Sequence, residues 1–226
     1  MGAVADNEAG TTSLPAILHC IYDPFCGWCY GAAPLLEAAR GVADLEIRLH
    51  GGGMMAGGRR QAVTEALRGF VVQHDRRIAQ LSGQPFGSAY TEGLLRDTGA
   101  VFDSAPPTTA ILAAETFGKG LDMLHRIQQA HFIEGQRIAE RETLARLAEE
   151  IGIDRAAYEK EFARVNGALT EQHMDESRAL LDRVGGAGFP TFALERDGKW
   201  MLLDHGGFLG RPAEWSAKLR TATEST

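Results

Sequence analysis

Strand-like runs occur only toward the two ends of this chain, and this separation limits the folds that it can adopt. The segment "PAILHCIY" (15–22) is a compact apolar run that stops at Asp23, as expected of a buried strand. The segment "LEIRLHG" (45–51) alternates apolar and polar residues and predicts a second strand. The residues after Cys26 have a helical apolar face that ends at Gly41. A strand, a helix and a strand in this order predict a parallel βαβ unit.

A helical block follows, because residues 53–167 carry apolar side chains at three- and four-residue spacing and show no strand pattern. We expect five helices there, the second after Pro106 and Pro107 and the fifth capped by Asp154. Their apolar positions are Val63, Leu67, Phe70, Ile78 and Leu81; Ile111 and Ala114; Leu121, Leu124 and Ile127; Leu144, Leu147 and Ile151; and the residues up to Phe162. A sixth helix is predicted over residues 170–184.

The strand pattern returns near the end of the chain. The runs "PTFAL" (190–194) and "WMLLD" (200–204) flank the turn "RDGK" (196–199), and an Asp-Gly pair between two apolar runs is a strong hairpin signal. A last helix is expected over residues 212–219. The order of elements predicts an α/β fold in which a helical insertion, residues 53–167, interrupts one domain.

The composition favours a folded protein and argues against two classes of partner. The chain has 226 residues, 44% of them hydrophobic, which suffices for a full core. Its 30 acidic and 23 basic residues give a formal charge of -7, opposite in sign to that of a nucleic-acid binder. The first residues, "MGAVADNEAGTTSLPA", show neither a basic start nor a long apolar run, which predicts a flexible tail (1–13) and neither a secretory signal nor a membrane anchor. We therefore expect a soluble cytoplasmic protein with no nucleic-acid or membrane partner.

Cys26 and Cys29, with Gly27 and Trp28 between them, lie where the first predicted strand gives way to a helix. At such a position the N-terminal N–H groups and the helix dipole stabilise a thiolate on the first cysteine. A thiolate attacks disulfides, and a second cysteine within the first turn can close a ring that releases the bound partner. Neither intervening residue is positively charged, so we expect a less oxidising pair than one with histidine in the gap. The motif predicts a redox-active pair.

The same cysteine spacing also occurs in zinc sites and among inert buried thiols. Zinc needs four ligands, and the sequence contains no second C-x-x-C and no close histidine pair, so no metal is expected. Cys20 belongs to the first strand, where β alternation favours a buried core thiol. Asp23 precedes Cys26 by three residues and either opposes thiolate formation or accepts a proton from Cys29; the sequence leaves this open. Pro34 is expected to bend the following helix.

A glycine-rich loop, "GGAGFPTF" (185–192), is the second segment with chemical interest. The Phe189–Pro190 bond, at the start of a strand, is a place where a cis peptide can occur; a trans proline that starts an edge strand is the alternative if the loop is taken by itself. A cis bond there would leave the N–H and C=O of Phe189 free to pair with an extended substrate.

These features together resemble the thioredoxin superfamily: a strand that ends before C-x-x-C, a proline eight residues after the first cysteine, and a late G-x-P-T-F loop. The large helical insertion narrows the resemblance to the DsbA-like branch. Within it, "YDPFCGWCYGAAP" (22–34) and "AHFIEGQRIAERETLARLAEEIGID" (130–154) are similar to a cytoplasmic subgroup related to 2-hydroxychromene-2-carboxylate isomerases and kappa-class glutathione transferases. The resemblance implies a flexible tail (1–13), a thioredoxin-like domain (14–52 and 168–222) and a helical insertion domain (53–167).

The resemblance also implies roles for particular residues. Cys26 is implied to be the nucleophile, Cys29 the resolving thiol, and Pro190 a cis proline that faces both. Glycine after the first cysteine, and a bulky residue before the proline, depart from the common family pattern and alter the groove. The residues expected to bind the substrate are Gly27, Trp28, Phe189 and Thr191.

Three functions are compatible with these residues. The leading one is a disulfide reductase or isomerase in which Cys26 attacks, a mixed disulfide forms and Cys29 releases it, with no bound cofactor and with glutathione or a thioredoxin-type protein as electron source. The alternative is a glutathione-dependent isomerase or transferase acting on a small molecule; the second cysteine argues against it, because such relatives often have a single serine there. A non-catalytic redox sensor or chaperone is the third. Either a monomer or a homodimer is compatible with the sequence.

Other segments are expected to have lesser roles. The stretch "HGGGMMAGGRR" (50–60) lacks the order of a phosphate-binding loop and favours a flexible hinge, with its two methionines near the active groove. His131 and His173 are expected to be structural or solvated, whereas His205, beside Asp204, is a candidate to face the groove. A solvated helix face is predicted for Glu140, Arg141, Glu142, Arg146, Glu149 and Glu150.

Overall fold

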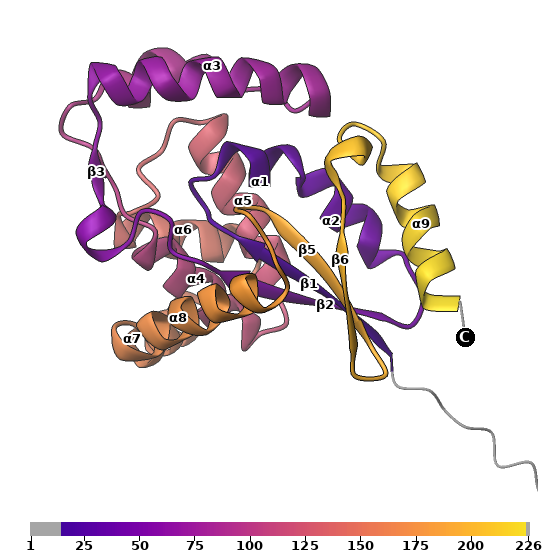
Figure 1. Cartoon of the computed structure of the whole chain (residues 1–226). Coiled ribbons are helices and arrows are strands. Elements are labelled where there is room, and N and C mark those ends of the chain that lie inside the picture. Colours follow the sequence, from indigo (N-terminus) through magenta and orange to yellow (C-terminus); the bar gives the residue numbers. More distant parts are fainter. Residues whose placement is uncertain (1–14, 225–226) are drawn as a thin grey trace, which may run out of the picture.

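The computed structural model describes residues 15–224, so the tail predicted for residues 1–13 lies outside the described part of the chain. A four-stranded sheet runs through the molecule (Figure 1). Its strands lie in the order β2 (Leu45–Gly51), β1 (Ala16–Tyr22), β5 (Thr191–Arg196) and β6 (Lys199–Leu203). β1 and β2 are parallel, whereas β5 is antiparallel to β1 and to β6. The predicted strands of the βαβ unit and the predicted hairpin are therefore confirmed.

The register of the sheet brings two distant segments together. Ile21 of β1 pairs with Thr191 of β5, so β5 begins beside the point where β1 ends. The residues that precede Thr191 in the chain therefore lie close to those that follow β1. At the other end of β5, Asp197 and Gly198 both have positive φ (50° and 73°), the conformation that favours an Asp-Gly hairpin turn.

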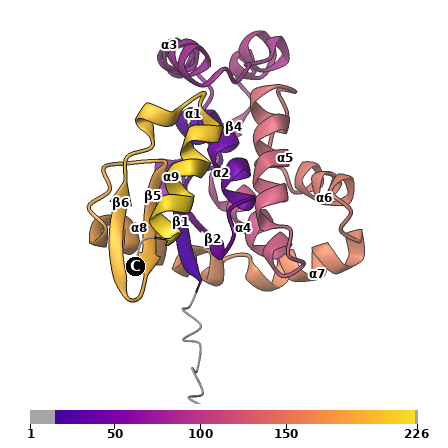
Figure 2. The ribbon, with the colours of Figure 1, turned by 90° about the vertical axis from the view of Figure 1, so that its right-hand side faces the viewer.

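Two short helices, rather than one bent helix, follow β1. α1 (Gly27–Gly31) and α2 (Ala33–Arg40) meet at Ala32, and Pro34 lies in the first turn of α2. The bend predicted at Pro34 is therefore wrong in position, because the helix breaks before the proline. Proline is tolerated in the first turn of the new helix, where the N–H that it lacks would have no helical partner. α2 packs against α9 (Pro212–Glu224), while α8 (Ala168–Arg183) lies on the opposite side of the sheet (Figures 1 and 2).

The segment between β2 and α8 is mostly helical. Its elements are η1 (Gly57–Arg59), β3 (Gln61–Ala62), α3 (Glu65–Ser82), η2 (Ala89–Gly93), η3 (Leu94–Arg96), β4 (Val101–Phe102), α4 (Ala105–Glu115), α5 (Gly120–Phe132), α6 (Arg141–Glu150) and α7 (Arg155–Val165). The expectation of no strand here was wrong, because β3 and β4 pair as an antiparallel ribbon. Each strand has two residues, too few to produce an alternating pattern. The division of the chain into domains at residues 53 and 167 stays a prediction.

The ends of the helices follow the local sequence. The Thr64 side chain accepts a hydrogen bond from the Leu67 N–H over 3.1 Å and caps α3, which ends at Gly83 (φ 75°). The predicted cap of α7 is confirmed, since Asp154 Oδ1 accepts from the Ala157 N–H over 2.9 Å. Only part of the expected apolar face of α3 is buried: Ile78 is inaccessible, whereas Phe70 is 62% exposed.

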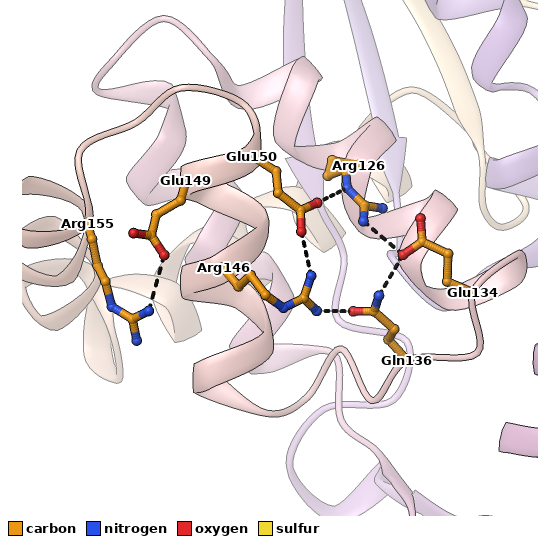
Figure 3. Close-up of polar contacts among 7 residues, drawn as sticks. All are labelled: Arg126, Glu134, Gln136, Arg146, Glu149, Glu150 and Arg155. Atoms are coloured by element: carbon orange, nitrogen blue, oxygen red, sulfur yellow. Dashed lines mark hydrogen bonds and ion pairs between the residues drawn. The ribbon is translucent and has the colours of Figure 1, made fainter.

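Ion pairs cover the outer side of α5 and α6 (Figure 3). Arg126 Nε donates to Glu150 over 2.6 Å, and a second Arg126 nitrogen donates to Glu134 over 2.8 Å. Arg146 donates to Glu150 over 2.5 Å. The acidic and basic residues of α6 that were predicted to form a solvated face are all exposed, which confirms that prediction. None of the helices in residues 15–224 is long and apolar enough to cross a membrane.

Candidate active site

Cys26 and Cys29 lie at the N-terminal end of α1, directly after the loop that leaves β1. Cys26 is the N-cap residue, with extended backbone angles (φ -81°, ψ 113°), and Cys29 follows within the first turn. The Cys26 N–H donates to Asp23 O over 3.1 Å, and the Tyr30 N–H donates to Cys26 O over 3.1 Å. Both thiols are free and buried. The sequence placed Cys26 correctly at the start of a helix, where the orphan N–H groups and the helix dipole favour a thiolate.

The glycine-rich loop meets the cysteines, as expected from the sequence. The Phe189–Pro190 peptide bond is cis, and the Cys26 thiol donates to Phe189 O over 3.4 Å. The Phe189 carbonyl was expected to be free for a substrate, but here it is the acceptor of the Cys26 thiol. The Phe189 ring lies against Gly52, where a Cβ would approach two ring atoms to 2.3 Å. The lack of a side chain at Gly52 therefore makes room for the bulky residue before the proline.

Trp28 is half-buried and lines two cavities, and Cys26 lines the second of them. The first cavity, of about 560 Å³, extends along the glycine-rich loop (185–192) to residues 202–205. The second, of about 660 Å³, lies between α1 and α3, and Cys26 and Phe70 are among its lining residues. Large apolar side chains dominate the lining of the second cavity, so it suits the apolar part of a substrate.

The other two expected binding residues have more limited access. Gly27 lines the cavity between α1 and α3 together with Cys26. Thr191 is buried, and its hydroxyl donates to Gly188 O over 2.7 Å, so its side chain holds the glycine-rich loop against β5. Its assignment as a substrate-binding residue stays a prediction.

Asp23 is a fully buried carboxyl group whose backbone carbonyl accepts the Cys26 N–H. Its Oδ1 accepts from the Phe25 N–H over 2.9 Å, and its Oδ2 accepts from the Met54 N–H over 2.5 Å. Burial raises the pKa of Asp23 to about 6, although these hydrogen bonds favour the charged form. A carboxyl group that titrates near neutral pH can accept and return a proton during the reaction. The contact with Met54 could not be predicted from sequence distance alone.

The three thiols have distinct surroundings. Burial raises the pKa of Cys20, which lies inside the core on β1, as the sequence predicted. Burial also raises the pKa of Cys29 well above its ordinary value, and the neighbouring Cys26 thiol raises it further. Cys29 therefore needs a proton acceptor before its sulfur can attack. Cys26 differs from both, because it occupies the N-cap and lines a cavity.

The glycine stretch after β2 is tied to its neighbours. The Gly51 N–H donates to His173 Nε2 over 3.0 Å, and Gly53 O accepts from Arg178 over 2.7 Å. Met54 and Met55 both line the cavity between α1 and α3, as expected for residues near the groove. The flexibility proposed for this stretch stays a prediction.

The histidines singled out in the sequence have different positions. His131 is buried against aromatic rings, among them Phe132, and burial lowers its pKa to about 3. His173 accepts the Gly51 N–H, so both have structural surroundings, as predicted. His205 lines the first cavity, and burial lowers its pKa, so the neutral imidazole faces the groove. Within residues 15–224 no group of three His, Cys, Asp or Glu side chains is placed to hold a metal ion.

The contribution of α3 to the site was not predicted from the sequence. Asp75 is buried on this helix and accepts a hydrogen bond from Tyr90 OH over 3.1 Å. Both residues line the cavity that contains Cys26. A signal for Asp75 was present, because it lies at helical spacing between Val71 and Ile78 and interrupts an otherwise apolar face.

Comparisons with known proteins agree with this geometry. Residues 18–207 match the family described as DSBA-like thioredoxin domain. The structure is similar to that of the cytosolic disulfide reductase DsbM from Pseudomonas aeruginosa, with 56% sequence identity, a TM-score of 0.86, and coverage of 91% of this chain and 98% of that chain. A structure of the same reductase with GSH matches with 53% identity, a TM-score of 0.84 and the same coverage.

More distant structures share the fold. A putative protein disulfide isomerase from Nitrosomonas europaea has 20% identity and a TM-score of 0.76, over 93% of this chain and 99% of that chain. A 2-hydroxychromene-2-carboxylate isomerase has 16% identity and a TM-score of 0.56, over 93% of this chain and 100% of that chain. No curated protein matches the sequence.

Proposed function

The chain belongs to the family of DSBA-like thioredoxin domains, and from this premise we propose that it is a thiol–disulfide oxidoreductase that reduces or isomerises disulfides in the cytoplasm. Cys26 is the nucleophile and Cys29 the resolving thiol. The observation that carries the proposal is the position of Cys26, which caps α1 and reaches Phe189 O beside the cis proline. The similarity to a cytosolic disulfide reductase at 56% identity supports the same activity and compartment.

The reaction proceeds by two exchanges. The Cys26 thiolate attacks one sulfur of a substrate disulfide, which forms a mixed disulfide, and the other substrate sulfur leaves and takes up a proton. Cys29 then gives up its proton, and its sulfur attacks Cys26 Sγ, so that the second substrate thiol leaves and a Cys26–Cys29 disulfide remains. Two electrons have passed to the substrate. Two glutathione molecules, or one dithiol protein, return them and form their own disulfide.

Asp23 is the group proposed to accept the Cys29 proton. It is buried near both cysteines, and burial raises its pKa to about 6, while burial keeps the pKa of Cys29 high. Proton transfer to a positioned carboxylate lowers the cost of forming the second thiolate at a buried position. The proton returns when the pair is reduced again.

Glutathione is the proposed electron donor. The structurally similar reductase from Pseudomonas aeruginosa has been determined with GSH. The first cavity, which extends from Trp28 along the glycine-rich loop, offers an extended thiol substrate the backbone of that loop beside the cis proline.

The first test is reduction of insulin with glutathione as the electron source, comparing the wild type with C26S, C29S and C20A. We expect C26S to be inactive and to form no adduct. C29S should accumulate a mixed disulfide detectable by intact mass, because the release step is missing. C20A removes a buried thiol outside the pair and should keep the activity.

Other outcomes would contradict this proposal. A wild type that forms no intramolecular disulfide in glutathione buffers would exclude the dithiol mechanism. Retention on immobilised glutathione that survives in C29S, without insulin reduction by the wild type, would favour the glutathione-dependent isomerase or transferase.

Sedimentation velocity would decide between monomer and homodimer.

A further inference from the structure

α3 packs on α1 at two glycines. A Cβ at Gly27 would lie 2.8 Å from Asp75 Oδ1 and 3.0 Å from Ile78 Cδ1, and one at Gly31 would lie 2.6 Å from Ile78 Cγ2. Neither glycine has a positive φ, so the reason for glycine at these positions is the close approach of α3. Gly27, the residue that follows Cys26, has no side chain because the Asp75 carboxyl group occupies the adjoining space.

Asp75 places that carboxyl group beside the N-terminal end of α1. The side chain is 6% exposed, and Oδ2 accepts a hydrogen bond from the buried Tyr90 hydroxyl over 3.1 Å. No ion pair is formed by Asp75 among residues 15–224. The titratable groups around it are Tyr90 from η2, Cys26, which lines the same cavity, His74 on α3 itself, and Arg76 and Glu92, which line a smaller cavity together with Asp75. The carboxylate therefore forms no ion pair within residues 15–224, and the charged form of His74 favours its ionised state only through a longer-range interaction.

Asp75 changes its charge close to neutral pH. Burial raises its pKa to about 6, and the hydrogen bond from Tyr90 favours the charged form. The group is therefore mostly ionised at pH 7 and neutral at pH 5. When ionised, the carboxylate lies beside Gly27, the residue after Cys26, and repels a thiolate on Cys26 in the cavity that both residues line.

We propose that Asp75 is a positioning residue that acts through Cys26, disfavours its thiolate and thereby keeps the Cys26–Cys29 pair reducing. The inference rests on the proposed dithiol function. Repulsion acts on the reduced pair, in which Cys26 can be charged, and not on the disulfide, in which it is neutral. The carboxylate thus shifts the equilibrium toward the disulfide, which makes the reduced pair a stronger electron donor.

The test compares the wild type with D75N, which replaces the carboxylate by an amide of the same shape. Each protein is equilibrated with reduced and oxidised glutathione at pH 8, and the fraction of intramolecular disulfide is measured by alkylation and intact mass. We expect the equilibrium constant for reduction of the D75N disulfide by glutathione to rise three- to tenfold. A tenfold change corresponds to about 30 mV for this two-electron couple.

The pH dependence separates an electrostatic role from a structural one. The two proteins should differ above pH 6, where Asp75 is charged, and should converge at pH 5, where it is protonated. Asp23 is common to both proteins, so its titration cancels in the comparison. A loss of packing in D75N would instead produce a difference that persists at pH 5.

Two further variants test whether the charge of Asp75 is the cause. Y90F removes the hydrogen bond that favours the charged carboxylate, so the pH at which it converges with D75N should move upward. If circular dichroism shows that D75N is unfolded, Y90F is compared with the wild type between pH 6 and 7, where loss of the hydrogen bond leaves more of Asp75 protonated and glutathione should reduce the disulfide more readily. E65Q removes an exposed carboxylate in the first turn of the same helix and should leave the equilibrium unchanged.

The outcomes are distinguishable. If D75N and Y90F both match the wild type at pH 8, the inference fails while the dithiol function stands. The inference also fails, and the dithiol function again stands, if the wild type and D75N differ by the same factor at pH 5 and pH 8. If the wild type forms no intramolecular disulfide in any glutathione buffer, the inference and the proposed function fail together.

Discussion

The backbone N–H of Met54 donates to Asp23 Oδ2 over 2.5 Å, which links the loop after β2 to a buried carboxyl group in the loop that leaves β1. The loop is itself held by α8, because Gly53 O accepts from Arg178. The chemistry of the cysteines therefore depends on segments that come together only in the folded chain. Asp23 is buried, so its titration should be visible both in stability and in catalysis.

The contribution of Asp23 to stability should fall as the pH rises from 4 to 7. The pKa of Asp23 is about 6 in the folded state against 3.8 as the reference, so the folded state binds the proton more tightly than the unfolded state. This contribution is therefore fully present below pH 4 and is lost as the pH rises through 6. Replacing Asp23 by Asn should reduce this loss by about 1–3 kcal/mol in urea titrations at the two pH values. Equal losses in the wild type and D23N would contradict the assignment.

The same substitution should slow the release step. Without a carboxylate to accept the Cys29 proton, the mixed disulfide on Cys26 should persist roughly 10- to 100-fold longer at pH 7. The effect should shrink at high pH, where hydroxide removes the proton. Quenched-flow alkylation measures the lifetime of the mixed disulfide, and the initial attack by Cys26 serves as the internal control. An unchanged lifetime in D23N would exclude Asp23 as the proton acceptor.

The parts of the site that depend on local sequence could be predicted. Cys26 follows an apolar strand and opens a helix, and Pro190 follows a glycine-rich run at the start of another strand, so short motifs were sufficient to place both. The contacts of Asp23 with Met54, and of Asp75 with Gly27, join residues 31 or more positions apart and cannot be inferred from a local pattern, even though Asp75 itself interrupts an apolar helix face. They follow from the packing of whole elements, which periodicity does not specify.

Errors in the predicted elements have equally local causes. Pro34 was expected inside a helix, but the chain begins a new helix just before it, where a missing N–H has no cost. β3 and β4 escaped prediction because two-residue strands have no period. Phe70 was assigned to a buried face, yet it lies 62% exposed beside the cavity between α1 and α3, because that part of α3 has no further layer above it.

Contact between α1 and α3 should make Gly31 intolerant of a side chain. A Cβ there would approach Ile78 Cγ2, a branched buried side chain, to 2.6 Å, so G31A should lower the free energy of unfolding by about 1–3 kcal/mol. G69A on α3 is the matched control. No atom lies within 4 Å of its new methyl group, and alanine should stabilise the helix by about 0.5–1 kcal/mol. Urea titration measures both, and equal stability of G31A and the wild type would contradict the packing.

Trp28 should contribute to substrate binding more than to redox equilibrium. It lines both cavities, so W28A should lower kcat/KM for a peptide disulfide by about tenfold, equivalent to about 1.4 kcal/mol. The glutathione equilibrium of the pair should stay within threefold of the wild type. M201A, an exposed position on β6 outside both cavities, is the control. A large change in the equilibrium with an unchanged kcat/KM would assign Trp28 to thiolate stabilisation instead.

Gly52 should control the position of the Phe189 carbonyl. A Cβ at Gly52 would meet the Phe189 ring at 2.3 Å, so the ring must move in G52A, and the carbonyl that accepts the Cys26 thiol moves with it. We expect attack by Cys26 on a peptide disulfide to slow by about tenfold, which is about 1.4 kcal/mol in the barrier. G58A, with no atom within 4 Å of its new methyl group, should react like the wild type. The clash requires the Phe189 ring, so the double variant G52A/F189A should react faster than the sum of the two single losses in rate predicts. A double-mutant cycle of stopped-flow rates measures this difference. Additive effects would show that Gly52 acts through the loop backbone and not through Phe189.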